Sequence, residues 1–127
     1  MGQQKRIRVV YADDDSNHRT ELLRSLLDKP GIEVVAVAVD GGAALQAIEE
    51  HQPDVALVDL GAPGISGIDV AEEVAARGDE LPTRVLLLEA TPIEPTPRVS
   101  QAVGRRGVVD RASSEDDICA AVAAAGA

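Results

Sequence analysis

Acidic side chains follow apolar segments of the chain at several points, and their type and spacing could support chemistry on a bound cation. Asp13 and Asp14 come directly after one apolar segment, Asp59 lies within a second at residues 55–60, and Glu89 follows a third. Two carboxylates about 4 Å apart repel each other by about 4 kcal/mol at an effective dielectric constant of about 20. A cluster of them therefore needs a cation or shared protons. Oxygen ligands around a small pocket suit Mg²⁺, which binds one or two carboxylates and keeps several waters.

Strands and helices that would position these carboxylates alternate along the chain. Apolar and β-branched runs predict strands at residues 6–12, 32–39, 55–60, 83–88 and 107–109. Four leucines at positions 22, 23, 26 and 27 share one face of a first predicted helix. The first predicted helix is capped by Ser16 or Asn17. The others begin at Asp40, Gly67, Arg98 and Ser114, and prolines at positions 92, 95 and 97 shorten the fourth.

This alternation is typical of an α/β fold, with a doubly wound five-stranded parallel sheet and helices on both faces. Ligands of such sheets bind beyond the carboxyl ends of the strands. In the strand order 2-1-3-4-5 the first and third strands are neighbours, so that Asp13, Asp14 and Asp59 converge. Glu89 and Arg111, which follow the fourth and fifth strands, would lie at the same edge.

Composition restricts the classes of partner. The 127 residues fit a single domain, residues 1–127, with a core at about 6–125. A formal net charge of −10 disfavours direct binding to DNA or to an anionic membrane. One cysteine excludes an internal disulfide, and no segment has the length and apolarity of a membrane span or a signal peptide. We therefore expect a cytoplasmic protein.

Three stretches carry a family resemblance: residues 12–14, residues 54–60 with Pro63, Gly64 and Gly67, and residues 104–112. Together they resemble the receiver domain of bacterial response regulators, from about residue 6 to residue 125. The sequence is similar to receivers that carry a LuxR-type DNA-binding domain. The resemblance implies a flavodoxin-like receiver fold, the N-terminal part of a longer regulator, and signalling rather than an enzymatic function.

The resemblance also implies a role for each acidic residue. Asp59 would be the phosphoacceptor in two-component signal transduction, with a sensor histidine kinase as partner. Mg²⁺ would be bound directly by Asp14, through water by Asp13, and by Asp59 and the backbone carbonyl of Gly61. DNA would be contacted only through a domain outside this chain, and a homodimer remains open.

Several positions depart from the receiver pattern. Glu89 stands where the family has Thr or Ser, and an ionised carboxylate cannot donate a hydrogen bond to a phosphoryl oxygen. Arg111 replaces the family's lysine, and Val108 replaces its aromatic residue. We therefore expect an atypical receiver in which Glu89 and Arg111 form an ion pair over Asp59 that mimics or blocks phosphorylation. The alternative is a Glu89 that points to solvent, and Thr91 could supply the missing hydroxyl if the strand bulged.

Two other functions stay open. One is a pseudo-receiver whose output depends on binding a protein or a small molecule, with Mg²⁺ bound weakly or not at all. The other, more remote, is an aspartyl-phosphate phosphohydrolase of the haloacid dehalogenase type, suggested by Asp13 and Asp15. Against it, the chain leaves no room for a cap domain, and Asn17 stands where such enzymes have Thr or Val.

Three remaining features are interpreted as structural. His18 is expected on the surface of the first helix rather than as a ligand. Cys119 is expected to pack in the core, and Arg105 with Arg106 forms a short basic spot in solvent.

Overall fold

The sheet is parallel throughout and has the predicted strand order. In a computed structural model, which describes residues 5–61, 65–89, 96–104 and 107–127, the five strands are arranged as β2-β1-β3-β4-β5. The strands are β1 (Ile7–Asp13), β2 (Ile32–Ala38), β3 (Val55–Asp59), β4 (Arg84–Glu89) and β5 (Val108–Asp110). The predicted doubly wound α/β fold is therefore confirmed.

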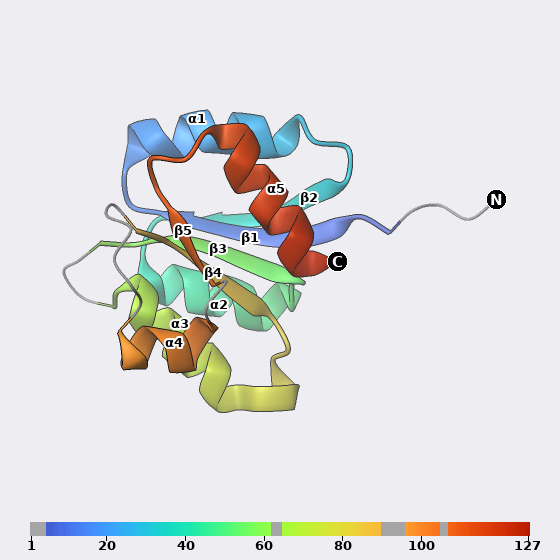
Figure 1. Cartoon of the computed structure of the whole chain (residues 1–127). Coiled ribbons are helices and arrows are strands. Elements are labelled where there is room, and N and C mark those ends of the chain that lie inside the picture. The colour runs from blue at the N-terminus through green and yellow to red at the C-terminus, as the bar shows by residue number, and fades with distance from the viewer. Residues whose placement is uncertain (1–4, 62–64, 90–95, 105–106) are drawn as a thin grey trace.

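Helices cover both faces of this sheet (Figure 1). One face carries α1 and α5, and the other carries α2, α3 and α4. The helices are α1 (Ser16–Leu27), α2 (Gly41–His51), α3 (Gly67–Arg77), α4 (Pro97–Val103) and α5 (Glu115–Gly126), with a short 3₁₀ helix η1 (Gly78–Glu80) after α3. The predicted short fourth helix is confirmed, since α4 has 7 residues. No helix within these described ranges is long and apolar enough to cross a membrane.

Two apolar cores lie on opposite faces of the sheet. Successive side chains of a strand point to opposite faces, so each buried strand contributes to both cores. Every residue of β3 is buried, because β3 lies in the middle of the sheet with helices on both sides. The core under α2 and α3 includes Val10, Ala12, Ala56 and Val58, and the core under α1 and α5 includes Val9, Tyr11, Val55, Leu57 and Cys119.

Two strands run one residue further than predicted. β1 ends at Asp13 rather than at residue 12, and β4 ends at Glu89 rather than at residue 88. Asp13 is therefore part of the sheet and fully buried, whereas Glu89 is exposed at the end of its strand. The extension of β1 places the Asp13 side chain against the neighbouring strand β3.

The start and end of α1 differ from the prediction. The helix is capped by Asp15, whose carboxylate accepts hydrogen bonds from the backbone N–H groups of Asn17 and His18, so neither Ser16 nor Asn17 is the cap. Leu27, predicted on the apolar face, is 63% exposed at the last residue of the helix. Its apolar face is shorter by one residue than the leucine pattern indicated.

Candidate functional site

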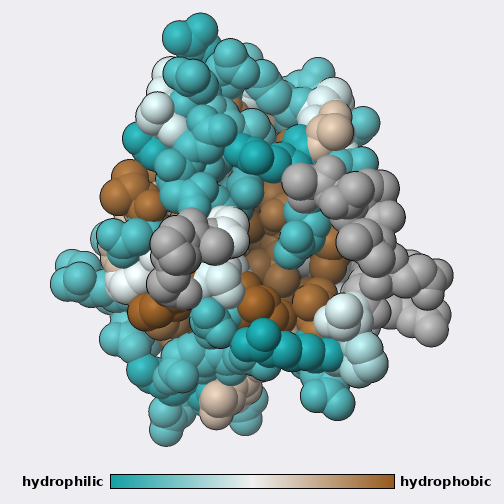
Figure 2. Space-filling model, turned by 90° about the vertical axis from the view of Figure 1, so that its left-hand side faces the viewer, coloured by the Kyte–Doolittle hydropathy of each residue, from teal (hydrophilic) through white to brown (hydrophobic). Residues whose placement is uncertain are grey.

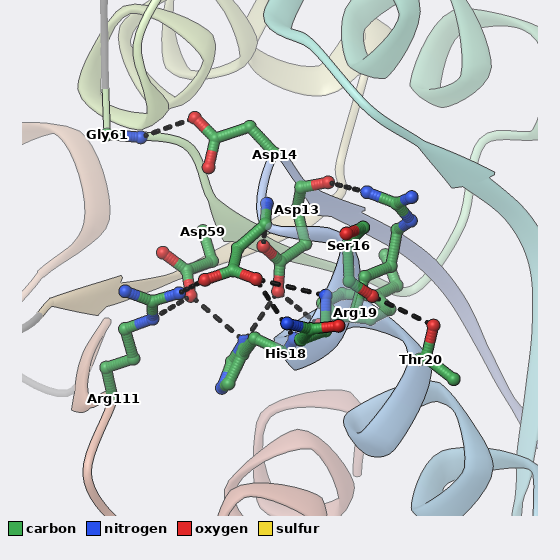
Figure 3. Close-up of polar contacts among 12 residues, drawn as sticks. Asp13, Asp14, Ser16, His18, Arg19, Thr20, Asp59, Gly61 and Arg111 are labelled. Carbon is green, nitrogen blue, oxygen red and sulfur yellow. Dashed lines mark hydrogen bonds and ion pairs between the residues drawn. The ribbon is translucent and has the colours of Figure 1, made fainter.

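Two buried carboxylates meet at the carboxyl edge of the sheet (Figure 3). Asp13 and Asp59 end the adjacent strands β1 and β3 and are directly paired in their parallel register. Asp13 is fully buried and Asp59 is 6% exposed. Asp14 is exposed and turned aside, since its Oδ2 accepts a hydrogen bond of 3.2 Å from the N–H of Gly61. The predicted convergence thus holds for two aspartates, and the third lies at the rim.

Arg111 approaches Asp59 from the end of β5. Its Nε lies 2.7 Å from Asp59 Oδ2, and its Nη2 lies 3.1 Å from Asp15 Oδ2. Within the described residues, Asp59 Oδ2 and Arg111 Nε are buried atoms without a hydrogen bond. The contact between them is therefore an ion pair in which the N–H does not point at the oxygen. A cation after the fifth strand reaches Asp59, as the sequence predicted.

The expected ion pair between Glu89 and Arg111 is wrong. Among the ion pairs of the described residues, Arg111 pairs with Asp15 and Asp59 and not with Glu89. The two residues meet through their backbones, where the Arg111 N–H donates to the Glu89 carbonyl at 2.8 Å. The contact with Asp59 is favoured because Asp59 is buried, and attraction between charges is stronger where water is excluded.

His18 belongs to the site, and its expected place on the helix surface is wrong. Its Nδ1 lies 2.6 Å from Asp13 Oδ2 and 3.3 Å from Asp59 Oδ2, and its side chain is 23% exposed. The sequence signal was its position in the first turn of α1, three residues after the capping Asp15. That turn begins directly beyond β1, so a side chain there can fold back over the strand ends.

Tyr11 is a second residue that the sequence analysis missed. Its hydroxyl is buried and donates to Asp13 Oδ2, while the N–H of Asp15 donates to Asp13 Oδ1 at 2.9 Å. Tyr11 precedes Asp13 by two residues on one strand, so both side chains point to the same face, and this spacing could have identified the pair. These two donors fix the orientation of the Asp13 carboxylate.

Electrostatics at the site are set mainly by burial. Burial, with the neighbouring charge of Asp13, raises the pKa of Asp59 to about 6, although Arg111 and His18 act in the opposite direction. Burial and the hydrogen bond to Asp13 raise the pKa of the Tyr11 hydroxyl well above its ordinary value. Burial lowers the pKa of Arg111, but the charges of Asp59, Asp13 and Asp15 and the hydrogen bond to Asp15 together outweigh it, so the pKa is raised and Arg111 stays cationic.

The donor atoms of the pocket fit a divalent cation. One ligand atom each from Asp13, His18 and Asp59 lies within 4.8 Å of the other two. A cation would offset the repulsion between the two buried carboxylates and would meet the Asp59 oxygen that has no hydrogen bond. Asp14 could add a third carboxylate from the rim, whereas the ligand role of the Gly61 carbonyl stays a prediction.

A recess of about 310 Å³ opens beside Asp59. Figure 2 views the carboxyl edge of the sheet and shows apolar side chains on the floor of a hollow. The polar residues around the recess include Asp59, Glu89 and Arg111, and its apolar floor is formed by Val58, Leu60, Ile68, Leu87 and Leu88. The predicted roles of Thr91, the proline-rich segment 91–95 and Arg105 with Arg106 fall outside the described residues.

Residues 9–123 match the family described as the response regulator receiver domain. The chain belongs to this family. The resemblance found in the sequence is thereby confirmed, and the protein is a receiver of two-component signal transduction. The match covers Asp13 and Asp15, the two residues on which the phosphohydrolase alternative depended.

Known relatives carry different outputs. The chain is 47% identical to the transcriptional regulatory protein NarL of Mycobacterium tuberculosis (strain ATCC 25618 / H37Rv) over 88 residues. These aligned residues make up 69% of this chain and 40% of NarL. The chain is 34% identical to protein-glutamate methylesterase/protein-glutamine glutaminase 2 of Anaeromyxobacter dehalogenans (strain 2CP-C) over 117 residues. This alignment spans 92% of this chain and 33% of that protein. The chain thus spans about two fifths or less of the length of these relatives.

Solved structures give the same assignment. The signal receiver domain of NarL from Mycobacterium tuberculosis is 40% identical and has a TM-score of 0.81, covering 97% of this chain and 98% of that chain. A two-component response regulator of the LuxR family from Aurantimonas sp. SI85-9A1 is 26% identical and has a TM-score of 0.83. The superposition covers 96% of this chain and 86% of that chain. Similarity to receivers of LuxR-type regulators, predicted from the sequence, is confirmed.

Proposed function

We propose that this receiver is switched by phosphorylation of Asp59. The observation that carries the proposal is the position of Asp59: a buried carboxylate at the end of the central strand, paired with Asp13 and reached by Arg111 at 2.7 Å. With a pKa raised to about 6, Asp59 is mostly ionised at neutral pH and can act as a nucleophile. An open recess beside it gives a phosphoryl donor access.

Phosphoryl transfer to Asp59 needs only one covalent step on the protein. A carboxylate oxygen of Asp59 forms a bond to phosphorus while the bond from phosphorus to the donor breaks, and the donor leaves with the electron pair. Mg²⁺ bound by Asp13, Asp14 and Asp59 would supply charge neutralisation of the phosphoryl oxygens. Arg111, whose Nε makes no hydrogen bond within the described residues, can donate to a phosphoryl oxygen from its planar fork. The atypical element of this receiver is therefore Arg111, and Glu89 stands at the rim of the recess.

The partners of the whole regulator follow from its relatives. We infer a sensor histidine kinase as the phosphoryl donor and a LuxR-type DNA-binding domain as the output, since identity to the transcriptional regulator NarL exceeds identity to the methylesterase. The net charge of −10 supports DNA contact through another domain. A homodimer is consistent with such an output, and a cytoplasmic location is consistent with partnership with DNA.

A second candidate is a pseudo-receiver that needs no phosphate. The observation that favours it is the present pairing of Asp59, which already has Arg111 at 2.7 Å and His18 at 3.3 Å. These contacts partly neutralise the carboxylate without any phosphoryl group. In that case the output would respond to a bound protein or small molecule.

Intact mass spectrometry after incubation with Mg²⁺ and acetyl phosphate or carbamoyl phosphate distinguishes the phosphorylated receiver from the pseudo-receiver. We expect a single adduct of about 80 Da on the wild type, which is absent in Asp59→Asn. Asp79→Asn is the matched control, because Asp79 is exposed on η1, which precedes the start of β4, whereas the pocket lies at the carboxyl ends of the strands. No adduct on the wild type with either donor would favour the pseudo-receiver, and an adduct that persists in Asp59→Asn would place the site elsewhere.

A further inference from the structure

The imidazole of His18 has no role in the phosphoryl transfer proposed above, although it lies inside the pocket. Its Nδ1 is 2.6 Å from Asp13 Oδ2 and 3.3 Å from Asp59 Oδ2, and Figure 3 shows the ring facing both aspartates. An ionised carboxylate only accepts hydrogen bonds, so Nδ1 carries a proton and donates, whether the ring is neutral or charged. His18 thus directs the positive end of an N–H bond at the place where the two carboxylates meet.

We propose that His18 is an autoinhibitory residue: its imidazole holds Asp13 and Asp59 in the resting receiver and must turn out of the pocket before Mg²⁺ binds there. The consequence for signalling rests on the proposed phosphorylation of Asp59, whereas the displacement of His18 does not. The histidine would thereby set the Mg²⁺ concentration at which the receiver accepts a phosphoryl group.

Three donors satisfy the Asp13 carboxylate in the resting pocket. The Asp15 N–H donates to Oδ1 at 2.9 Å, and Oδ2 is shared by the Tyr11 hydroxyl and His18 Nδ1. Of the three, His18 is the donor whose nitrogen also lies 3.3 Å from Asp59 Oδ2. The imidazole therefore occupies the gap between the two carboxylates, which a cation shared by them needs.

Mg²⁺ and the imidazole cannot occupy this gap together. Mg²⁺ requires oxygen ligands in near-octahedral geometry at about 2.0–2.1 Å and keeps several waters. A ring nitrogen that carries a proton cannot act as a ligand, and its N–H bond would point at the cation. Binding of Mg²⁺ between Asp13 and Asp59 therefore costs the two contacts that His18 makes.

The structure gives the His18 ring a path out of the pocket. The side chain is 23% exposed, and residues 14–17, which precede it, are all exposed. Its backbone is fixed, since the His18 N–H donates to the capping carboxylate of Asp15 at 3.2 Å. Rotation of the side chain alone therefore moves the ring into solvent and leaves α1 in place.

The effect on Mg²⁺ binding follows from the population of the closed arrangement, in which His18 contacts the aspartates. A hydrogen bond to an ionised group is stronger than one between neutral groups, so the closed arrangement predominates when no cation is bound. The apparent affinity for a ligand is reduced by the fraction of molecules that are open. Removing the imidazole should therefore raise the Mg²⁺ affinity, and restoring a donor at this position should lower it again.

Isothermal titration calorimetry with Mg²⁺ tests this on the unphosphorylated chain. We expect His18→Ala to bind Mg²⁺ at least about fivefold more tightly than the wild type. His18→Asn, whose amide can present an N–H at a similar distance from the backbone, should bind more weakly than His18→Ala. His51→Ala is the matched control with wild-type affinity, because His51 is the other of the two histidines and is the last residue of α2. Equal or weaker Mg²⁺ binding by His18→Ala would overturn the proposal.

Nuclear magnetic resonance of the histidine rings separates displacement from a merely structural role. With ¹⁵N-labelled histidine, the hydrogen-bonded Nδ1–H of His18 should give a signal in the metal-free protein that His18→Asn lacks. We expect this signal to disappear at saturating Mg²⁺, because an N–H in solvent exchanges rapidly with water. A signal that persists at saturating Mg²⁺ would refute the displacement.

Labelling with acetyl phosphate tests the consequence for phosphorylation. The adduct of about 80 Da is followed over a series of Mg²⁺ concentrations in the wild type and in His18→Ala. We expect the variant to reach half of its maximal labelling rate at a several-fold lower Mg²⁺ concentration. The same Mg²⁺ dependence in both proteins contradicts control of phosphorylation by His18. If neither protein is labelled at any Mg²⁺ concentration, the proposed phosphorylation fails, while calorimetry and the ring signal still decide the displacement of His18.

Discussion

Replacing Asp59 by asparagine should stabilise the folded protein at neutral pH. Folding raises the pKa of this carboxyl from its ordinary value of 3.8 to about 6, chiefly because it is buried. A difference of about two pKa units corresponds to about 3 kcal/mol, by which the ionised form is disfavoured in the folded state. Asparagine has nearly the same shape and no charge, so the variant removes this cost. We expect a gain of about 1–3 kcal/mol at pH of about 7.5.

The sign of the pH dependence is specific to this cause. Below the ordinary value of 3.8, Asp59 is protonated in both states and contributes nothing. Between this value and about 6 the unfolded chain ionises while the folded chain keeps its proton, so stability falls as the pH rises through this window. The gain from Asp59→Asn should therefore shrink to less than about 1 kcal/mol at pH of about 4.

Urea unfolding followed by far-ultraviolet circular dichroism measures this difference, since the chain has no tryptophan and only one tyrosine. Wild type, Asp59→Asn and the exposed control Asp79→Asn are compared at each pH, so that contributions common to all three cancel. A loss of stability in Asp59→Asn at pH of about 7.5, or a gain of equal size at both pH values, would show that burial of the charge is not the dominant cost.

Two further substitutions test how the pocket and its supporting loop are built. Tyr11→Phe removes the buried hydroxyl that donates to Asp13, and we expect a loss of about 1.5–3 kcal/mol in urea unfolding at neutral pH; an unchanged midpoint would mean that another donor replaces it. Gly41→Ala places a Cβ against the backbone oxygen of Ile65, and a loss of about 1–3 kcal/mol is expected. Gly42→Ala is its matched control, since its Cβ meets only ordinary contacts and should cost nothing; equal losses would refute the steric explanation.

The sequence by itself determined the fold and the meeting of the first and third strands. Continuous apolar runs of strand length, alternating with amphipathic helices, leave a covered parallel sheet as the arrangement that buries both faces. Once the strand order is known, Asp13 and Asp59 must lie together, because parallel strands end at one edge. The prediction that Asp13 and Asp59 converge therefore depended only on local patterns and on topology, whereas the exposed position of Asp14, predicted to join them, was seen only in the structure.

Tertiary structure decided which side chains pair with the carboxylates of Asp13 and Asp59. Arg111 could have paired with Glu89, Asp15 or Asp59, and sequence spacing does not rank carboxylates that converge from different strands. His18 was assigned to the surface because helical periodicity describes the sides of α1 and not the direction of its first turn. Both outcomes depend on how deeply each group is buried, and burial arises only when distant segments pack. The sequence thus located the acidic pair, and packing determined its partners.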